Sequence, residues 1–208
     1  MKTGRISLRN EKGFTLIEMA IVLVIIGLIL GAVIKGKDVM NSAKQKKFYT
    51  SVIKTWELSV ASYYDRTGNL LADGTANGGS VATKNGAFDN ISGANFAAVN
   101  GIDARLKAVG LEVPVSNTTV SGQNTYTGTY SGTRTITLYL YYLNSSNGYR
   151  NALYFTNMPT DLAIALDTII DGEADGTKGS FRQYTDATNW PDASTTTTVN
   201  AAYTINIP

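Results

Sequence analysis

Residues 14–34 read FTLIEMAIVLVIIGLILGAVI, an apolar run that contains one charged side chain, Glu18. As an α-helix this run is about 30 Å long, which matches the hydrocarbon thickness of a bilayer. Basic residues stand on both sides of it, from Lys2 to Lys12 before the run and from Lys35 onward after it. The run is therefore predicted to be a transmembrane helix. The positive-inside rule keeps the short leader cytoplasmic and sends the C-terminal part across the membrane.

A cleaved secretory signal and a permanent anchor are the two ordinary interpretations of such a segment. A signal peptide has a shorter apolar run that ends in a small-x-small cleavage site. Here the run continues directly into GAVIKGKDVM (31–40), which contains no convincing site of that kind. The permanent anchor is therefore the stronger of these two interpretations.

Glu18 points to a more specific interpretation. A carboxylate near the bilayer centre costs about 2.5–3.5 kcal/mol, so it usually marks a function or a partner. The surrounding string KGFTLIEMAIVLVIIGLIL (12–30) resembles the prepilin peptidase recognition motif of type IV pilins and type II secretion pseudopilins. In that family a short basic leader is cut after the glycine, the new N-terminal phenylalanine is N-methylated, and the glutamate supports assembly. The resemblance implies that Gly13 precedes the cleaved bond, that Phe14 becomes the new terminus, and that Glu18 is the assembly acid.

The physical chemistry agrees with this resemblance. Cleavage creates a positive amine in a low-dielectric setting, and the carboxylate of a neighbouring subunit can neutralise it. Gly27 and Gly31 form a GxxxG pair. The pair either allows close packing of two helices or consists of ordinary glycines of a membrane helix without a packing role. Gly27 also matches the glycine at which helices of the family loosen on assembly. Many relatives place a proline further along, where this chain has Lys35.

The helical pattern continues beyond the apolar run. Apolar residues recur near helical spacing as far as Tyr63, and no proline interrupts them. We expect one helix over 14–65, with Gly68 as its stop signal. The apolar stripe over 49–63 should be buried against a C-terminal domain, because an exposed stripe would add little stability to an isolated helix.

Charge is distributed unevenly along the chain. The formal net charge is +2, composed of +3 over residues 1–13, +4 over 14–54, and −5 over the remainder, which has eight basic and thirteen acidic residues. The lysines at 44, 46 and 47 are most simply a solvated face. Contact with anionic lipid or nucleic acid is the alternative, and nothing else in the sequence indicates nucleic acid.

The chain contains no histidine and no cysteine. This composition excludes Ser-His-Asp and Cys-His catalysis, thiolate and imidazole metal sites, and a disulfide framework. No convincing pair of catalytic carboxylates is present either. We therefore expect a protein that is not an enzyme.

The C-terminal part is predicted to be a small antiparallel sheet with short helices. TRTITLYLYYL (133–143) alternates cleanly, and NSSNG (144–148) turns the chain into a second strand over 149–156, which predicts a β-hairpin. The remaining predicted segments are a loop over 69–95, a weak helix over 95–109, a helix over 160–170 and a strand over 198–207. Thr-rich runs at 117–133 and 194–198 are candidates for exposed or glycosylated segments.

The loop IDGEADGTKGSFR (170–182) is the best candidate for cation binding. Asp171, Glu173 and Asp175 match the first half of an EF-hand, but Arg182 stands where calcium needs a bidentate glutamate, so the loop is not an EF-hand. The stretch also resembles a C-terminal signature of some prepilin-like proteins, and some pseudopilins bind calcium in this general region. Two interpretations remain, a tight polar turn and a calcium site, and no other cofactor is expected.

These observations predict an α+β protein with three parts: a cleaved leader over 1–13, a helix over 14–65 that spans the membrane over 14–34, and a pilin-like domain over 66–208. The resemblance implies a structural subunit of a type IV pilus or pseudopilus, first held in the inner membrane and then placed in a periplasmic or cell-surface filament. Its expected partners are prepilin peptidase, other pilin copies, the inner-membrane assembly machinery and membrane lipid. A membrane-anchored adhesin or ligand-binding domain is the alternative.

Overall fold

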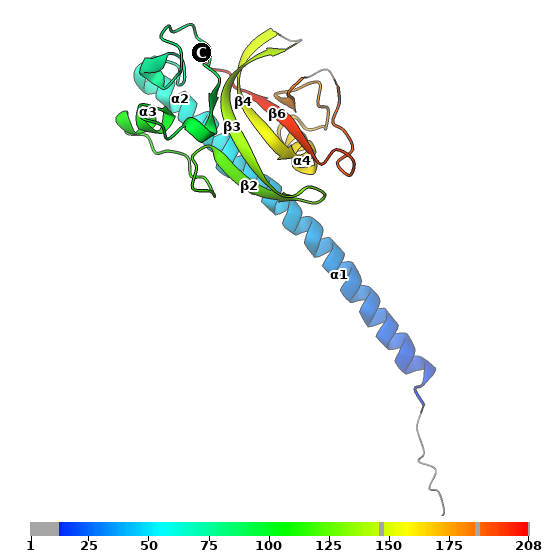
Figure 1. Cartoon of the computed structure of the whole chain (residues 1–208). Coiled ribbons are helices and arrows are strands. Elements are labelled where there is room, and N and C mark those ends of the chain that lie inside the picture. The colour runs from blue at the N-terminus through cyan, green and yellow to red at the C-terminus, as the bar shows by residue number, and fades with distance from the viewer. Residues whose placement is uncertain (1–12, 146–147, 186–187, 208) are drawn as a thin grey trace, which may run out of the picture. The chain divides into compact units, whose positions relative to one another are not determined.

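The computed structural model describes residues 13–145, 148–185 and 188–207. The chain divides into two compact units, Met1–Ala43 and Lys44–Pro208. Figure 1 shows the order of the elements. The fold is α+β, with a long N-terminal helix and a small antiparallel sheet, as the sequence predicted.

The N-terminal helix is the longest element. It consists of three consecutive segments: α1 (Leu16–Phe48), the π-helical segment η1 (Tyr49–Lys54) and α2 (Thr55–Thr67). Gly68 ends α2 in the left-handed conformation, and its N–H donates to the carbonyl of Tyr64 at 2.7 Å. Such a residue is the common way to end a helix. The helix that we expected over 14–65 thus begins at Leu16 and ends at Thr67.

Hydroxyl side chains accompany the π-helical segment. The Thr50 hydroxyl donates to the carbonyl of Lys46 at 3.1 Å, and the Ser51 hydroxyl donates to that of Lys47 at 2.7 Å. Side chains that enter the helical hydrogen-bond ladder in this way are a known cause of local deformation. The sequence pattern did not predict this interruption.

Six strands of the described chain form one antiparallel sheet. Their order is β1-β3-β4-β6-β5. Strand β2 is not in this sequence of neighbours; like β1, it pairs with β3. The strands are β1 (Ile91–Ser92), β2 (Gln123–Gly128), β3 (Gly132–Ser145), β4 (Gly148–Pro159), β5 (Phe181–Gln183) and β6 (Thr198–Thr204). The predicted hairpin is confirmed as β3 and β4, and the predicted last strand is confirmed as β6.

Short helices complete the C-terminal unit: η2 (Thr75–Asn77), η3 (Gly93–Asn95), α3 (Ile102–Ala108) and α4 (Thr160–Asp171). The helix predicted over 160–170 is confirmed as α4. The helix predicted over 95–109 is wrong in its first half. Asn100 has a positive φ of 60° there, and Gly101 is extended, so α3 begins only at Ile102.

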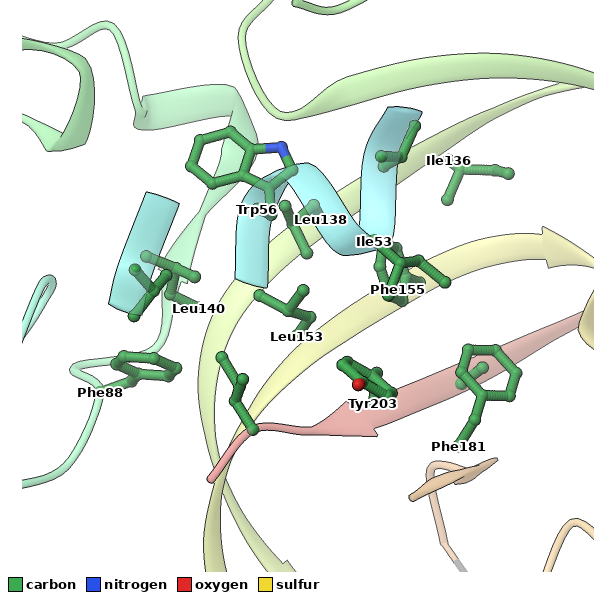
Figure 2. Packing of buried hydrophobic residues seen from close by; sticks show 14 of the residues in the cluster. Ile53, Trp56, Phe88, Ile136, Leu138, Leu140, Leu153, Phe155, Phe181 and Tyr203 are labelled. Carbon is green, nitrogen blue, oxygen red and sulfur yellow. The ribbon is translucent and has the colours of Figure 1, made fainter. Parts of the chain in front are cut away.

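The main core lies between the sheet and the helix that covers one of its faces. Ile53 and Trp56 of the helix come together with Leu138, Leu153 and Phe155 of β3 and β4 (Figure 2). All five side chains are at most 2% exposed. The prediction that the apolar stripe of the helix is buried against the C-terminal domain is therefore confirmed.

The Thr-rich run at 117–133 contains a strand that the sequence did not predict. This strand, β2, packs Tyr126 edge-on against Phe48 of the helix, with ring centroids 5.9 Å apart. The free side of β2 is partly occupied by a side chain, because the Asn117 amide accepts from the N–H of Thr125 at 2.7 Å and donates to its carbonyl at 2.8 Å. A side chain that mimics a neighbouring strand in this way protects a sheet edge.

Candidate functional site

The predicted cleavage position lies just before the helix. Gly13, Phe14 and Thr15 are not helical, and Phe14 is 85% exposed. A Cβ atom added to Gly13 would meet no atom within 4 Å. Accessible, non-helical backbone is the kind that proteases cut. From Gly13 to Thr15 the backbone at the predicted cleavage position is therefore exposed and non-helical.

Thr15 and Glu18 form a reciprocal cap on the first turn of α1. The Glu18 carboxylate accepts from the Thr15 N–H at 2.8 Å and from the Thr15 hydroxyl at 2.7 Å, and the Glu18 N–H donates to that hydroxyl at 3.3 Å. This arrangement is a capping box, which satisfies donors that the start of a helix leaves unpaired. We did not predict Thr15 as a site residue. The pattern Thr-x-x-Glu ahead of an apolar run could have revealed it.

The cap fixes the place of the Glu18 carboxylate relative to the cleavage position. Both bonds from Thr15 end on Oε2, so Oε1 has no hydrogen bond among the described residues. A carboxylate has capacity for several donors. Glu18 can therefore cap its own helix and still accept a hydrogen bond from a cationic amine.

The described residues leave the apolar part of α1 exposed. Within the described residues, one helix is long and apolar enough to cross a membrane. No residue in its most apolar stretch of 18 residues is buried. Cβ atoms added at Gly27 and Gly31 would meet nothing within 4 Å. An apolar surface of this extent is normally covered by lipid or by other protein. Both glycines leave room for the close approach of another helix.

The acidic loop is held together by its own hydrogen bonds. Asp171 accepts from the N–H groups of Ser180 and Phe181 at 2.9 and 2.8 Å. Asp175 accepts from the Thr177 hydroxyl at 2.6 Å, and these Thr177 bonds are the main reason that its pKa falls to about 2. Both carboxylates thus stabilise a tight polar turn.

The predicted metal ligands Asp171, Glu173 and Asp175 are not gathered around one point. The described residues contain no group of three or more acidic or histidine side chains placed to hold a metal ion. Glu173 is exposed at the tip of the loop, while the other two carboxylates face the loop backbone. The hydrogen bonds of Asp171 and Asp175 form the polar turn, and calcium binding stays a prediction.

Asp167, on the last turns of α4, is a buried acid that we did not predict. Its side chain is fully buried, and its carboxylate accepts from the indole N–H of Trp190 at 2.6 Å. The pKa of Asp167 is raised to about 6, mainly because the carboxyl is buried, and the charge of the neighbouring Asp171 is part of that rise. A single aspartate on a helix gives no signal in the sequence that it is buried.

Comparison with known proteins identifies one family model. Residues 8–34 match the prokaryotic N-terminal methylation motif. No curated protein and no solved structure shows significant similarity to the chain. The match contains Gly13, Phe14, the Thr15–Glu18 cap and Gly27. This chain thus carries the N-terminal methylation motif that is the hallmark of type IV pilins and pseudopilins.

Proposed function

We propose that the chain is a structural subunit of a type IV pilus or pseudopilus filament and not an enzyme. In this proposal prepilin peptidase cuts the precursor after Gly13, Phe14 becomes the methylated N-terminus, and α1 packs into the filament core. The observation that carries the proposal is the coincidence of the methylation motif with an apolar helix that the described part of the chain leaves exposed.

An uncovered apolar helix suits two successive environments. Lipid covers it while the precursor is held in the inner membrane, and neighbouring helices cover it after assembly. Both steps need a surface that the folded C-terminal unit leaves free, and the helix provides one. The partners follow from these steps: prepilin peptidase, copies of this chain or other pilins, and the inner-membrane machinery that moves the subunit from lipid into a periplasmic or surface filament.

Glu18 is the residue that we assign to assembly. A charge left without a partner in a low-dielectric helix bundle costs several kcal/mol. A neighbour's carboxylate that meets the amine of Phe14 removes this cost for both groups. The capping bonds from Thr15 hold the carboxylate in place for that contact.

The experiment compares three forms of the full chain in cells with active prepilin peptidase: wild type, Glu18→Ala and Glu18→Gln. Glutamine keeps the capping box but removes the charge. We expect both variants to be cleaved and to stay in the membrane, while their recovery in sheared filaments falls by tenfold or more. Blots of filament and membrane fractions measure this.

The glutamine variant separates the two tasks of Glu18. Wild-type recovery with Glu18→Gln would mean that the cap, and not the charge, is what assembly needs. Wild-type recovery with Glu18→Ala would remove Glu18 from the assembly mechanism. A wild-type chain that is found only in membranes would contradict the filament proposal and support the anchored adhesin or ligand-binding domain.

A further inference from the structure

The C-terminal unit has a groove with apolar walls and two lysines at its rim. It has a volume of about 720 Å³ and runs between the helix near the junction of α1 and η1 and the strand β2. Phe48, Tyr126 and the 86% exposed Val115 give its apolar walls. Lys44 and Lys47 are exposed at its rim. The ion pairs found among the described residues involve neither lysine.

The acidic loop after α4 presents one carboxylate on a fixed backbone. Asp171 is bound to the N–H groups of Ser180 and Phe181, and Asp175 forms an ion pair with Lys178 at 3.1 Å. Between them Gly172, Glu173 and Ala174 are exposed. The loop thus holds two of its carboxylates inward and directs the third, that of Glu173, to solvent.

These two surfaces are complementary in charge and lie apart on the same unit. The segment around 110–122 (green), which supplies one wall of the groove, and the loop after α4 (orange) lie on opposite sides of β3 and β4 (Figure 1). The charge of the chain after residue 54 is −5, whereas the lysines of the groove belong to the basic stretch before it. Complementary patches at two different places on a molecule allow its copies to bind head to tail.

We propose that the groove receives the acidic turn 172–174 of a second copy of the chain, with the carboxylate of Glu173 between Lys44 and Lys47. This inference rests on the proposed filament function. The contact is heterologous, so it does not close on itself and repeats from subunit to subunit. Because the turn is already fixed by internal hydrogen bonds, little conformational freedom is lost on docking. The charge pair sets which surfaces meet and in what register.

Charge reversal in the full chain tests the pairing. Lys44→Glu combined with Lys47→Glu, and separately Glu173→Lys, each place like charges together. We expect each to lower filament recovery by about tenfold or more. In the chain that carries all three substitutions, the amount of protein in filaments should return to most of the wild-type level. Failure of the triple variant to recover any of the lost filament protein would overturn the proposal. Loss of membrane retention in the lysine variant alone would instead assign the lysines to anionic lipid.

Disulfide trapping tests the proximity directly, because the natural chain has no cysteine. Ser51 lines the groove and Ala174 lies in the acidic turn. A chain with Ser51→Cys and Ala174→Cys should give a ladder of cross-linked multimers when filaments are oxidised. The control pairs Ala174→Cys with Leu58→Cys, which is 64% exposed on α2 outside the groove. This control should give no ladder.

The outcomes distinguish this contact from the function on which it rests. Filaments that form normally but show no ladder, or the same ladder in the control, overturn the docking proposal and leave the filament function intact. A wild-type chain that forms no filaments overturns both.

Discussion

At the start of α1, the Glu18 carboxylate caps the helix, and we propose that it also takes part in assembly. Within its own chain Glu18 accepts hydrogen bonds from Thr15 and so caps the helix. In the proposed filament it also accepts a hydrogen bond from the N-terminal amine of a neighbour. The second task depends on the first, because the cap restricts the rotamers of a side chain that would otherwise be free. In the proposed filament, Thr15 is therefore a positioning residue for assembly.

Removal of the cap should loosen the first turn of the helix. Thr15→Ala deletes the hydroxyl, and the loss of such a cap costs about 1 kcal/mol. We expect amide hydrogens of the first turn to exchange about fivefold faster in detergent, as that free energy implies. Thr15→Ser keeps the hydroxyl and should behave like wild type. Equal exchange rates in the alanine and serine variants would show that the cap is not formed in solution.

Asp167 makes the stability of the protein depend on pH. Its pKa is raised to about 6 in the folded chain, above the ordinary value of 3.8, so the folded state binds more protons than the unfolded state between these values. Stability from this group is present below about pH 4 and is lost as the pH rises towards 6. Asp175 acts in the opposite direction, since its pKa is lowered from 3.8 to about 2. Its contribution to stability is lost as the pH falls from about 4 to about 2.

Replacement of Asp167 by asparagine should remove the loss of stability between pH 4 and 7. Asparagine still accepts from the indole of Trp190, but it cannot ionise in the core. The difference between the variant and wild type should grow as the pH rises, to at most roughly 3 kcal/mol at pH 7. Thermal melts of the full chain in detergent, followed by tryptophan fluorescence, measure it. A wild-type chain whose stability is constant from pH 4 to 7 would contradict the raised pKa.

Among the elements, the strands with alternating apolar residues were the most predictable. In β3, Ile136, Leu138 and Leu140 point into the core and are at most 2% exposed, so the alternation in the sequence reflects burial directly. In β2, QNTYTG has no apolar alternation. It is an edge strand that contributes mainly Tyr126 to the core, and its pairing with β3 cannot be read from its own residues.

The N-terminal helix was predictable in its extent and its buried face, but not in its details. Helical spacing identified Trp56 and Val60 as core residues, and both are at most 2% exposed. The π-helical segment depends on hydroxyl bonds and on packing, which periodicity does not encode. Among the candidate site residues, Gly13, Phe14 and Glu18 came from one local motif. Asp167 and the groove depend on segments that are distant in the sequence, so no local pattern revealed them.

The acidic loop should remain stable without calcium. The carboxylates of Asp171 and Asp175 already have donors within the loop, and a cation would have to displace them. We expect the thermal melt of the full chain in detergent to be the same in millimolar calcium and in chelator. Calcium at 100 times its Kd would add about 2.7 kcal/mol, so a site of that affinity would be easily seen. A clear rise of the melting temperature with calcium alone would establish the metal site instead.

For the whole molecule, hydropathy and charge divide the chain into parts with different tasks. The apolar stretch of α1 is exposed among the residues that the structure describes, whereas the unit from Lys44 onward has its own continuous core. In the proposed function, the first part exchanges lipid for protein neighbours while the other stays folded. This division is what a subunit that is stored in a membrane and later polymerised requires.

The most direct test of this account is the intact mass of the chain in sheared filaments from cells with active prepilin peptidase. We predict a chain that begins at Phe14, lacks residues 1–13 and carries one additional methyl group on its amine. Fragmentation of the N-terminal peptide places that methyl group. A chain that retains Met1 and is recovered only in the membrane fraction would contradict the account.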